Sequence, residues 1–332
     1  MGSFGKVYRY EYGRQKRAVK IKVRKAGQEM ADDLDFTSEV NALCRLADSP
    51  HPNVMVGFQL TLFDTWVRTG VAAVEMAFYP CSGDQVGPIP GDYQLKTVRY
   101  AAVIREIASG LNHLHRHNII HKDLKPQNIL IGSDGHCVIA DYGSSVDTQD
   151  NKLSYTQSGQ ILEYGNSIVT TGFVAPEILF VGNGGFATYD SKVDVWSLGM
   201  TIYSLITGWM APAQYISHAV LGLDGSNRMR SEMEKRGCPQ PVQALVLTMC
   251  QINPEHRMNC LDIITVADML LKHEDKDPAK LEAPFVVEYV AQEEGDDGQE
   301  YNPLWNLTPP NPAASTGIME FGRLLKKYRP RL

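Results

Sequence analysis

The stretch "HKDLKPQNIL" (residues 121–130) places a histidine, an aspartate, two lysines and an asparagine within eight positions, directly before an apolar run. A carboxylate, two ammonium groups and an amide at this spacing can orient a hydroxyl group, screen a phosphate and hold a metal ion. A polar surface turn has the same composition now and then by chance. The interpretation therefore depends on which other polar residues the chain keeps at matching distances.

Length, composition and charge narrow the class of protein. The chain has 332 residues, 43% of them hydrophobic and 21% charged, which is enough for two lobes and a tail. The net charge of −6 argues against nucleic-acid binding, which needs a basic face. The six cysteines form no Cys-x-x-Cys pair, so we expect reduced thiols and neither a disulfide framework nor a zinc site. With no run of about 18 apolar residues and no visible signal peptide, we expect a cytoplasmic or nuclear protein that binds no membrane.

The first part of the chain has the periodicity of a small sheet with one helix. Alternation of polar and β-prone residues around Gly13 predicts a hairpin over residues 5–23. Apolar residues at steps of three and four predict a helix over residues 35–46. Two more strands are expected at residues 58–63 and 70–78.

After Pro80 the pattern becomes helical. Residues 97–116 have one apolar side, and residues 194–208 are apolar nearly all round, as expected of a helix at the centre of a helical lobe. An acidic run at residues 293–300 and a Pro- and Asn-rich run at residues 301–315 predict a partly disordered tail.

With these elements in order, the chain resembles the eukaryotic protein kinases, whose catalytic loop reads H-R-D-L-x-x-x-N. The matching motifs are "RAVKIKV" (17–23), "HKDLKPQN" (121–128), "ADYG" (140–143), "APE" (175–177), "DVWSLG" (194–199) and "NPEHRM" (253–258). The resemblance covers about residues 2–270. It implies an α+β, bilobal protein-kinase fold: an N-lobe (1–78) with a small antiparallel β-sheet and one helix, a larger, mainly α-helical C-lobe (79–278) and a C-terminal tail (279–332).

The resemblance implies a role for each polar residue of the opening stretch. Asp123 would accept the proton of a substrate hydroxyl group, and Lys125, whose D-L-K-P context matches the serine/threonine branch, would screen the γ-phosphate. Thr170 would brace these two residues. Asn128 and Asp141 would bind Mg²⁺, with Tyr142 replacing the usual Phe and adding a hydroxyl group that needs a partner.

The resemblance also implies an ATP site and two structural contacts. Lys20 would contact the α- and β-phosphates and pair with Glu39. The other implied ATP-binding residues are those of the glycine-rich loop, the adenine slot, the gatekeeper and the hinge: Gly2, Gly5, Val7, Ala18, Val74, Glu75, Ala77 and Leu130. Asp194 would hold the backbone of the catalytic loop, and a buried pair would join Arg257 to Glu177, the glutamate of the APE motif.

Two departures from the family pattern affect function. The glycine-rich loop lacks its first glycine and the strand before it, so we expect a fragment or a late start of translation, an N-lobe without its first strand, an exposed Val7 and weakened ATP binding. Lys122 stands where the family usually has an arginine that grips a phosphate, and lysine offers only a point charge. Phosphorylation of residues 141–177 by an upstream kinase therefore stays open, with Ser154, Thr156, Ser158 and Ser167 as candidates.

The expected function is that of a serine/threonine protein kinase that uses ATP and Mg²⁺ and acts on a protein substrate. One alternative is a pseudokinase or weakly active regulatory domain, because the first strand of the glycine-rich loop is absent. A second is a small-molecule kinase of the aminoglycoside-phosphotransferase type, which shares the H-x-D-x-x-x-x-N loop. Enzymes of that type lack the APE motif, the D-x-W-S-x-G helix start and the distant arginine, and this chain has all three.

Overall fold

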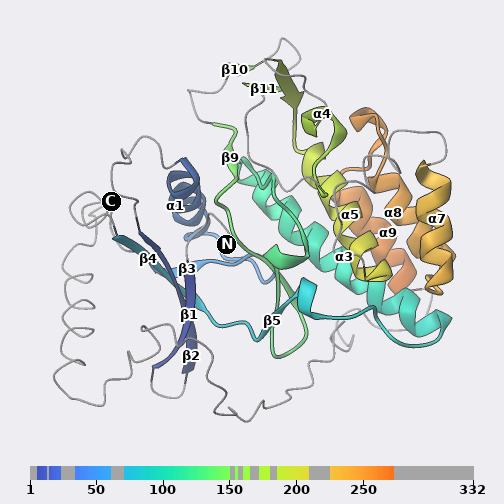
Figure 1. Cartoon of the computed structure of the whole chain (residues 1–332), viewed down its shortest axis with the longest axis horizontal. Helices are drawn as coiled ribbons and strands as arrows, with labels where there is room; N and C mark the ends of the chain where they lie inside the picture. Colours follow the sequence, from blue (N-terminus) through green and yellow to red (C-terminus); the bar gives the residue numbers. More distant parts are fainter. Residues whose placement is uncertain are drawn as a thin grey trace, which may run out of the picture.

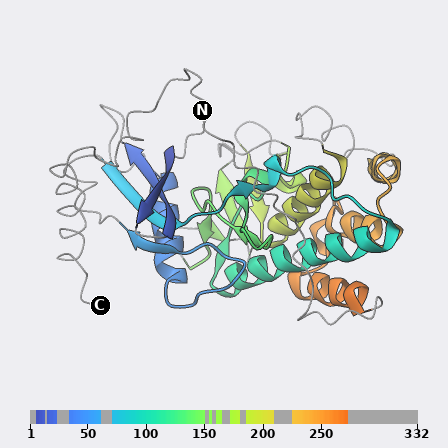
Figure 2. The ribbon, with the colours of Figure 1, turned by 90° about the horizontal axis from the view of Figure 1, so that it is seen from below.

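A sheet with one helix and a larger group of helices lie side by side in the computed structural model (Figure 1). The structure describes residues 6–12, 15–23, 34–60, 71–149, 154–155, 160–164, 172–179, 185–208 and 225–272. Seen from below, the sheet lies at one end and the helices extend away from it, with α9 beneath α3 (Figure 2). This is the arrangement that the resemblance implies, a small antiparallel sheet with one helix beside a larger helical lobe.

The sheet has four strands in the order β1-β2-β4-β3, and each pair is antiparallel. Its elements are β1 (Lys6–Tyr12), β2 (Gln15–Val23), α1 (Leu34–Leu46), β3 (Gly57–Leu60) and β4 (Val71–Ala77). Strands β1 and β2 form the predicted hairpin, with the register closing at Tyr12 and Gln15. Ala18 and Lys20 lie two residues apart on β2, so their side chains point to the same face of the sheet, and both are buried.

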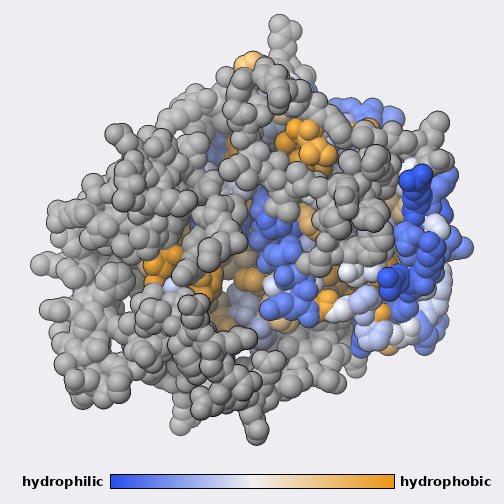
Figure 3. All heavy atoms as spheres, viewed as in Figure 1, coloured by the Kyte–Doolittle hydropathy of each residue, from blue (hydrophilic) through white to orange (hydrophobic). Residues whose placement is uncertain are grey.

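The helical part contains α3 (Tyr93–Arg116), α4 (Pro176–Leu179), α5 (Lys192–Thr207), α7 (Gly225–Lys235), α8 (Gln240–Met249) and α9 (Cys260–Lys272). Helix α5 is its centre, because every residue after Lys192 is buried, as its all-round apolar pattern predicts. Gly199 allows α5 to approach α8 closely, since a Cβ atom there would lie 2.5 Å from Cys250 Sγ. Helix α7 buries Met229 and Met233 and carries the hydrophilic surface at the right of Figure 3.

Short strands and 3₁₀ turns connect the helices and hold the loops between them. They are β5 (Cys81–Ser82), η2 (Gly83–Gln85), β6 (Ile119–Ile120), η3 (Pro126–Asn128), β7 (Ile129–Ile131), β8 (Cys137–Ile139), β9 (Val146–Asp147), β10 (Ser154–Tyr155), β11 (Ile161–Tyr164), β12 (Phe186–Tyr189) and η4 (Pro254–His256). The stretch 121–128 lies between β6 and β7. The loop at 121–128 runs from β6 to β7, and the loop at 141–145 runs from β8 to β9. Because β6 pairs with β9 and β7 pairs with β8, the start of each loop lies beside the end of the other. No helix in the described ranges is long and apolar enough to cross a membrane.

Candidate active site

Lys20 joins three distant parts of the chain. Its Nζ donates to Glu39 Oε1 on α1 and to Asp141 Oδ1, each at 2.8 Å. Burial alone would lower the pKa of Lys20, but the negative charges of Glu39 and Asp141 and the hydrogen bonds to them raise it above its usual value, so the amine stays charged. The sequence predicts the pair of Lys20 with Glu39, and the structure adds the direct contact of Lys20 with Asp141.

The stretch 121–128 folds so that its polar side chains contact one another. Lys125 Nζ lies 2.6 Å from Asp123 Oδ2. Asn128 Nδ2 donates to the Asp123 backbone oxygen at 2.7 Å and lies 3.3 Å from Asp123 Oδ2. His121 accepts a hydrogen bond from the Asp123 N–H on Nδ1, so its Nε2 donates to the backbone oxygen of Ala140 at 3.1 Å. The aspartate, the lysine and the asparagine of the motif therefore form one cluster.

Asp194 of α5 binds the backbone at the start of this loop. Its two carboxylate oxygens accept the backbone N–H groups of His121 and Lys122, each at 2.8 Å, as the motif implies. His115 Nε2 lies 2.8 Å from the same carboxylate, and Cys260 Sγ lies 3.7 Å from His115 Nδ1. Burial alone would lower the pKa of His115, but the hydrogen bonds to Asp194 and Cys260 and the negative charge of Asp194 raise it to about 10. The loop is therefore held by an imidazolium–carboxylate pair whose carboxylate is fully buried.

Sequence reasoning did not identify His115 as part of this support. His115 is one of three histidines in "HLHRHNII" (113–120), and nothing in the local sequence indicates which residue it contacts. Lys122 has a left-handed backbone, with φ 64°. Its ammonium group is buried 5.2 Å from the centroid of the Tyr189 ring on β12.

The segment after β8 places Asp141 and Tyr142. Asp141 has a left-handed backbone, with φ 67°, and its carboxylate reaches Lys20. The hydroxyl group of Tyr142, expected to need a partner, donates to the backbone oxygens of Met55 at 2.9 Å and Ile139 at 3.0 Å. The ring is fully buried, and burial raises the pKa of Tyr142 well above its usual value, so the phenol stays neutral.

The predicted adenine-site residues lie on β2, on the two strands that pair with it, β1 and β4, and on β7. Val74 lies opposite Lys20 in the β2–β4 register and is buried with Ala18, while Leu130 on β7 is partly buried. Val7 is 61% exposed. Glu75, expected in the hinge, accepts a hydrogen bond from Arg17 Nη1 at 2.7 Å, and Ala77 ends β4 opposite the same arginine. Gly2, Gly5 and Thr170, together with Thr156, Ser158 and Ser167, lie outside the described residues.

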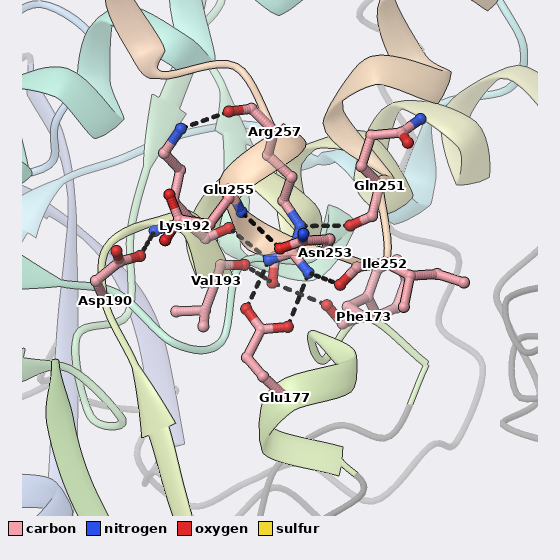
Figure 4. Close-up of polar contacts among 11 residues, drawn as sticks. Phe173, Glu177, Asp190, Lys192, Val193, Gln251, Ile252, Asn253, Glu255 and Arg257 are labelled. Atoms are coloured by element: carbon pink, nitrogen blue, oxygen red, sulfur yellow. Dashed lines mark hydrogen bonds and ion pairs between the residues drawn. The ribbon is translucent and has the colours of Figure 1, made fainter. Parts of the chain in front are cut away.

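Arg257 and Glu177, which lies in α4, form a bidentate pair (Figure 4). Nη1 lies 2.6 Å from Oε1 and Nη2 lies 2.7 Å from Oε2. The remaining guanidinium N–H groups donate to the backbone oxygens of Lys192, Gln251 and Ile252. The Arg257 side chain is 0% exposed, so the sequence-based prediction of a buried structural pair agrees with the geometry.

A charged lysine linked to two carboxylates, a catalytic-loop cluster and the buried arginine pair occur here in the order that protein kinases keep. The sequence model of the family described as "Protein kinase domain" matches residues 1–273. The chain belongs to the protein kinase domain family. The match covers every motif on which the resemblance depends.

Curated relatives of this kinase domain are named as protein kinases, several of them as serine/threonine-protein kinases. A calcium and calcium/calmodulin-dependent serine/threonine-protein kinase of Medicago truncatula is 28% identical over 249 residues, which is 72% of this chain and 43% of the relative. A serine/threonine-protein kinase of Arabidopsis thaliana is 32% identical over 157 residues, 46% of this chain and 29% of the relative. A probable cell division protein kinase of Encephalitozoon cuniculi is 37% identical over 123 residues, 35% of this chain and 42% of the relative. The kinase domain thus matches less than half the length of each of these relatives.

The fold of the kinase domain also matches solved structures. A chain in the structure of the CAK complex of Chaetomium thermophilum bound to ATP-γ-S superposes with a TM-score of 0.58. The match covers 80% of this chain and 87% of that chain at 19% sequence identity. At 19% sequence identity, this structural similarity is evidence for the fold alone.

Proposed function

We propose that this kinase domain transfers the γ-phosphate of ATP to a serine or threonine hydroxyl group of a protein substrate. The observation that carries the proposal is the double contact of Lys20 with Glu39 and Asp141, formed while Asp123, Lys125 and Asn128 are clustered on the neighbouring loop. Phosphoryl transfer depends mainly on alignment and charge neutralisation, and this arrangement provides both.

The phosphate end of the nucleotide is assigned to Lys20. Its charge is maintained by two carboxylates, and its position is fixed by hydrogen bonds to both. The adenine is assigned to three apolar side chains on or near β2, those of Ala18, Val74 and Leu130. Val7, which lies on β1 opposite Lys20, is assigned to the same site. Glu75 and Ala77 are assigned to the hinge, and Gly2 and Gly5 to the loop over the phosphates.

The donor set fits a Mg²⁺ ion at Asn128 and Asp141. In the described part of the chain, Asn128 uses its Nδ2 toward Asp123 and no hydrogen bond occupies its Oδ1, while Asp141 uses only Oδ1 toward Lys20. One carboxylate oxygen and one amide oxygen are thus available, the hard oxygen ligands that Mg²⁺ prefers together with substrate phosphates. When bound, the ion supplies charge neutralisation at the phosphates.

The transfer step is assigned to Asp123 and Lys125. Asp123 is buried and its Oδ2 accepts from Lys125 Nζ, so the carboxylate is held where it can accept the proton of an incoming hydroxyl group. The ammonium group of Lys125 screens the negative charge of the phosphate that moves. Thr170 is assigned as the brace of these two side chains, and an upstream kinase acting on residues 141–177 belongs to the same proposal.

Binding of ATP·Mg²⁺ and phosphorylation of a generic protein substrate by wild type, Asp123→Ala and Lys20→Met test the proposal. Asp123→Ala should keep ATP binding and lower the transfer rate by about 10²–10⁴-fold. Lys20→Met should weaken ATP binding as well. Nucleotide binding without transfer in wild type would favour the pseudokinase alternative, and no binding of ATP·Mg²⁺ by wild type would refute the proposal.

A further inference from the structure

One arginine at the end of α1 connects this helix to the segment that follows Asp141. Arg45 lies in the last turn of α1, and its Nη2 forms an ion pair with Asp147 Oδ2 on β9. Its Nη1 donates to Gln149 Oε1 at 3.0 Å and lies 3.3 Å from the backbone oxygen of His117. One guanidinium group therefore contacts both the segment after Asp141 and the turn after α3.

The partners of Arg45 lead directly into the catalytic loop. Asp147 pairs with Ile119 in the β6–β9 register, and the Thr148 N–H donates to the backbone oxygen of Asn118 at 2.8 Å. Strand β6 ends at Ile120, immediately before His121. A displacement of β9 would therefore change the position of the loop that carries Asp123.

Helix α1 is thus fixed at two points. Glu39 reaches Lys20, and Arg45, six residues further on, reaches Asp147 about 9 Å along the helix axis. With Glu39 as its one polar contact, α1 would be held otherwise by the packing of Leu43 and Leu46 in the core and would keep some freedom to tilt. The second contact, between Arg45 and Asp147, removes this freedom. Glu39 is linked through Lys20 to Asp141, so both contacts connect α1 to the same segment.

We propose that Arg45 and Asp147 are a positioning pair that holds α1 in the orientation in which Glu39 reaches Lys20. The inference rests on the proposed kinase function and adds the way in which its site is assembled. Because Asp147 is a carboxylate, its charge does not depend on modification, and the pair holds α1 without a phosphate on residues 141–177. Both side chains are partly exposed, at 30% and 25%, so the pair controls the position of one helix more than the stability of the whole fold.

Charge reversal on the full chain, treated with a phosphatase, tests the pair. The variants are Arg45→Glu, Asp147→Arg and the double variant that carries both. The matched control is Arg105→Glu, which reverses one member of a similarly exposed ion pair between α3 and α9, with Arg105 Nε 2.5 Å from Asp268 Oδ1. Three quantities are measured: hydrogen exchange of the α1 amides, the Kd of a fluorescent ATP analogue with Mg²⁺, and kcat.

Each single reversal should speed exchange of the α1 amides and weaken nucleotide binding by about fivefold, the equivalent of about 1 kcal/mol. The double variant should recover at least half of each loss, whereas Arg105→Glu should change neither. Unchanged exchange in the single variants, or a double variant no better than they are, would overturn the inference. So would faster exchange with Kd and kcat unchanged in an active wild type, since the pair would then be only structural.

Failure of the proposed function gives a different result. If wild type binds no ATP·Mg²⁺, the kinase proposal fails, and the exchange of the α1 amides in the three variants still decides whether the pair positions α1.

Discussion

Removal of the Glu177 carboxylate is expected to destabilise the kinase domain strongly, because it leaves a buried positive charge without its counter-ion. All five N–H donors of Arg257 are satisfied: two by the carboxylate of Glu177 and three by the backbone oxygens of Lys192, Gln251 and Ile252. Glu177→Ala keeps the three backbone contacts and removes the only negative charge among these partners. The guanidinium cannot reach water to compensate, since its side chain is fully buried.

Breaking a buried pair by removing one partner costs about 3–5 kcal/mol. In a domain of this size, each kcal/mol lowers the melting temperature by about 2–4 °C, so Glu177→Ala should melt about 6–20 °C below wild type. Removing both partners should cost less than the sum of the two single changes, because no charge is then left unpaired. Glu177→Gln should lie between wild type and Glu177→Ala, since its amide retains one acceptor but carries no charge.

Thermal unfolding followed by circular dichroism measures these differences. The matched control is Glu232→Ala on α7, which removes the acidic member of an exposed pair with Lys235 and should change stability by less than about 1 kcal/mol. A melting temperature of Glu177→Ala within the range of this control would refute the assignment of the pair as a buried structural contact. Strict additivity of Glu177→Ala and Arg257→Ala in the double variant would contradict it as well.

Three further changes test other parts of the structure. Tyr142→Phe removes the only hydrogen bond to the buried Met55 carbonyl among the described residues, so the free energy of unfolding in urea should fall by about 1–2 kcal/mol, and an unchanged midpoint would contradict that contact. Gly199→Ala places a methyl group 2.5 Å from Cys250 Sγ and should cost about 1–3 kcal/mol in the same assay; a neutral result would mean that α5 and α8 can separate. His115, whose pKa is raised to about 10, stabilises the fold fully below its ordinary pKa of 6.5, and this contribution is lost as pH rises toward 10. Melting temperatures over that window should therefore fall more in wild type than in His115→Asn, and parallel profiles would contradict the charged imidazole.

Periodicity was sufficient to predict helices α1, α3 and α5. The expected helix over residues 35–46 is α1, which begins one residue earlier. Periodicity predicts α3 from residue 97, whereas the helix begins at Tyr93, because the Asp92 side chain caps it by accepting the Leu95 N–H at 2.8 Å. An apolar pattern marks the buried face of a helix, and the first turn of α3 has none, so only the cap could have shown the true start.

Other features could not be predicted because their cause lies far away in the sequence. Arg45 and Asp147 are separated by 102 positions, and each alone is an ordinary surface charge. The three-stranded sheet β10-β11-β12 is built from segments of two to four residues, which are too short for a period of two to be recognised. Its register places Ile161 opposite Tyr189, and both are buried. Contacts of this kind depend on the assembled fold.

Two loop residues show why backbone geometry is hard to predict from local sequence. Lys122 and Asp141 have left-handed backbones, which cost about 1–3 kcal/mol for residues other than glycine. Next to and at Lys122, the backbone N–H groups of His121 and Lys122 each donate a hydrogen bond to the Asp194 carboxylate. Each hydrogen bond to a charged group stabilises the fold by about 1.5–3 kcal/mol, so the two together exceed this cost. At Asp141 the contact with the Lys20 ammonium has the same effect. The backbone conformation at these two residues is therefore stabilised by Asp194 on α5 and by Lys20 on β2. The local sequence supplies the polar side chains but does not determine this conformation.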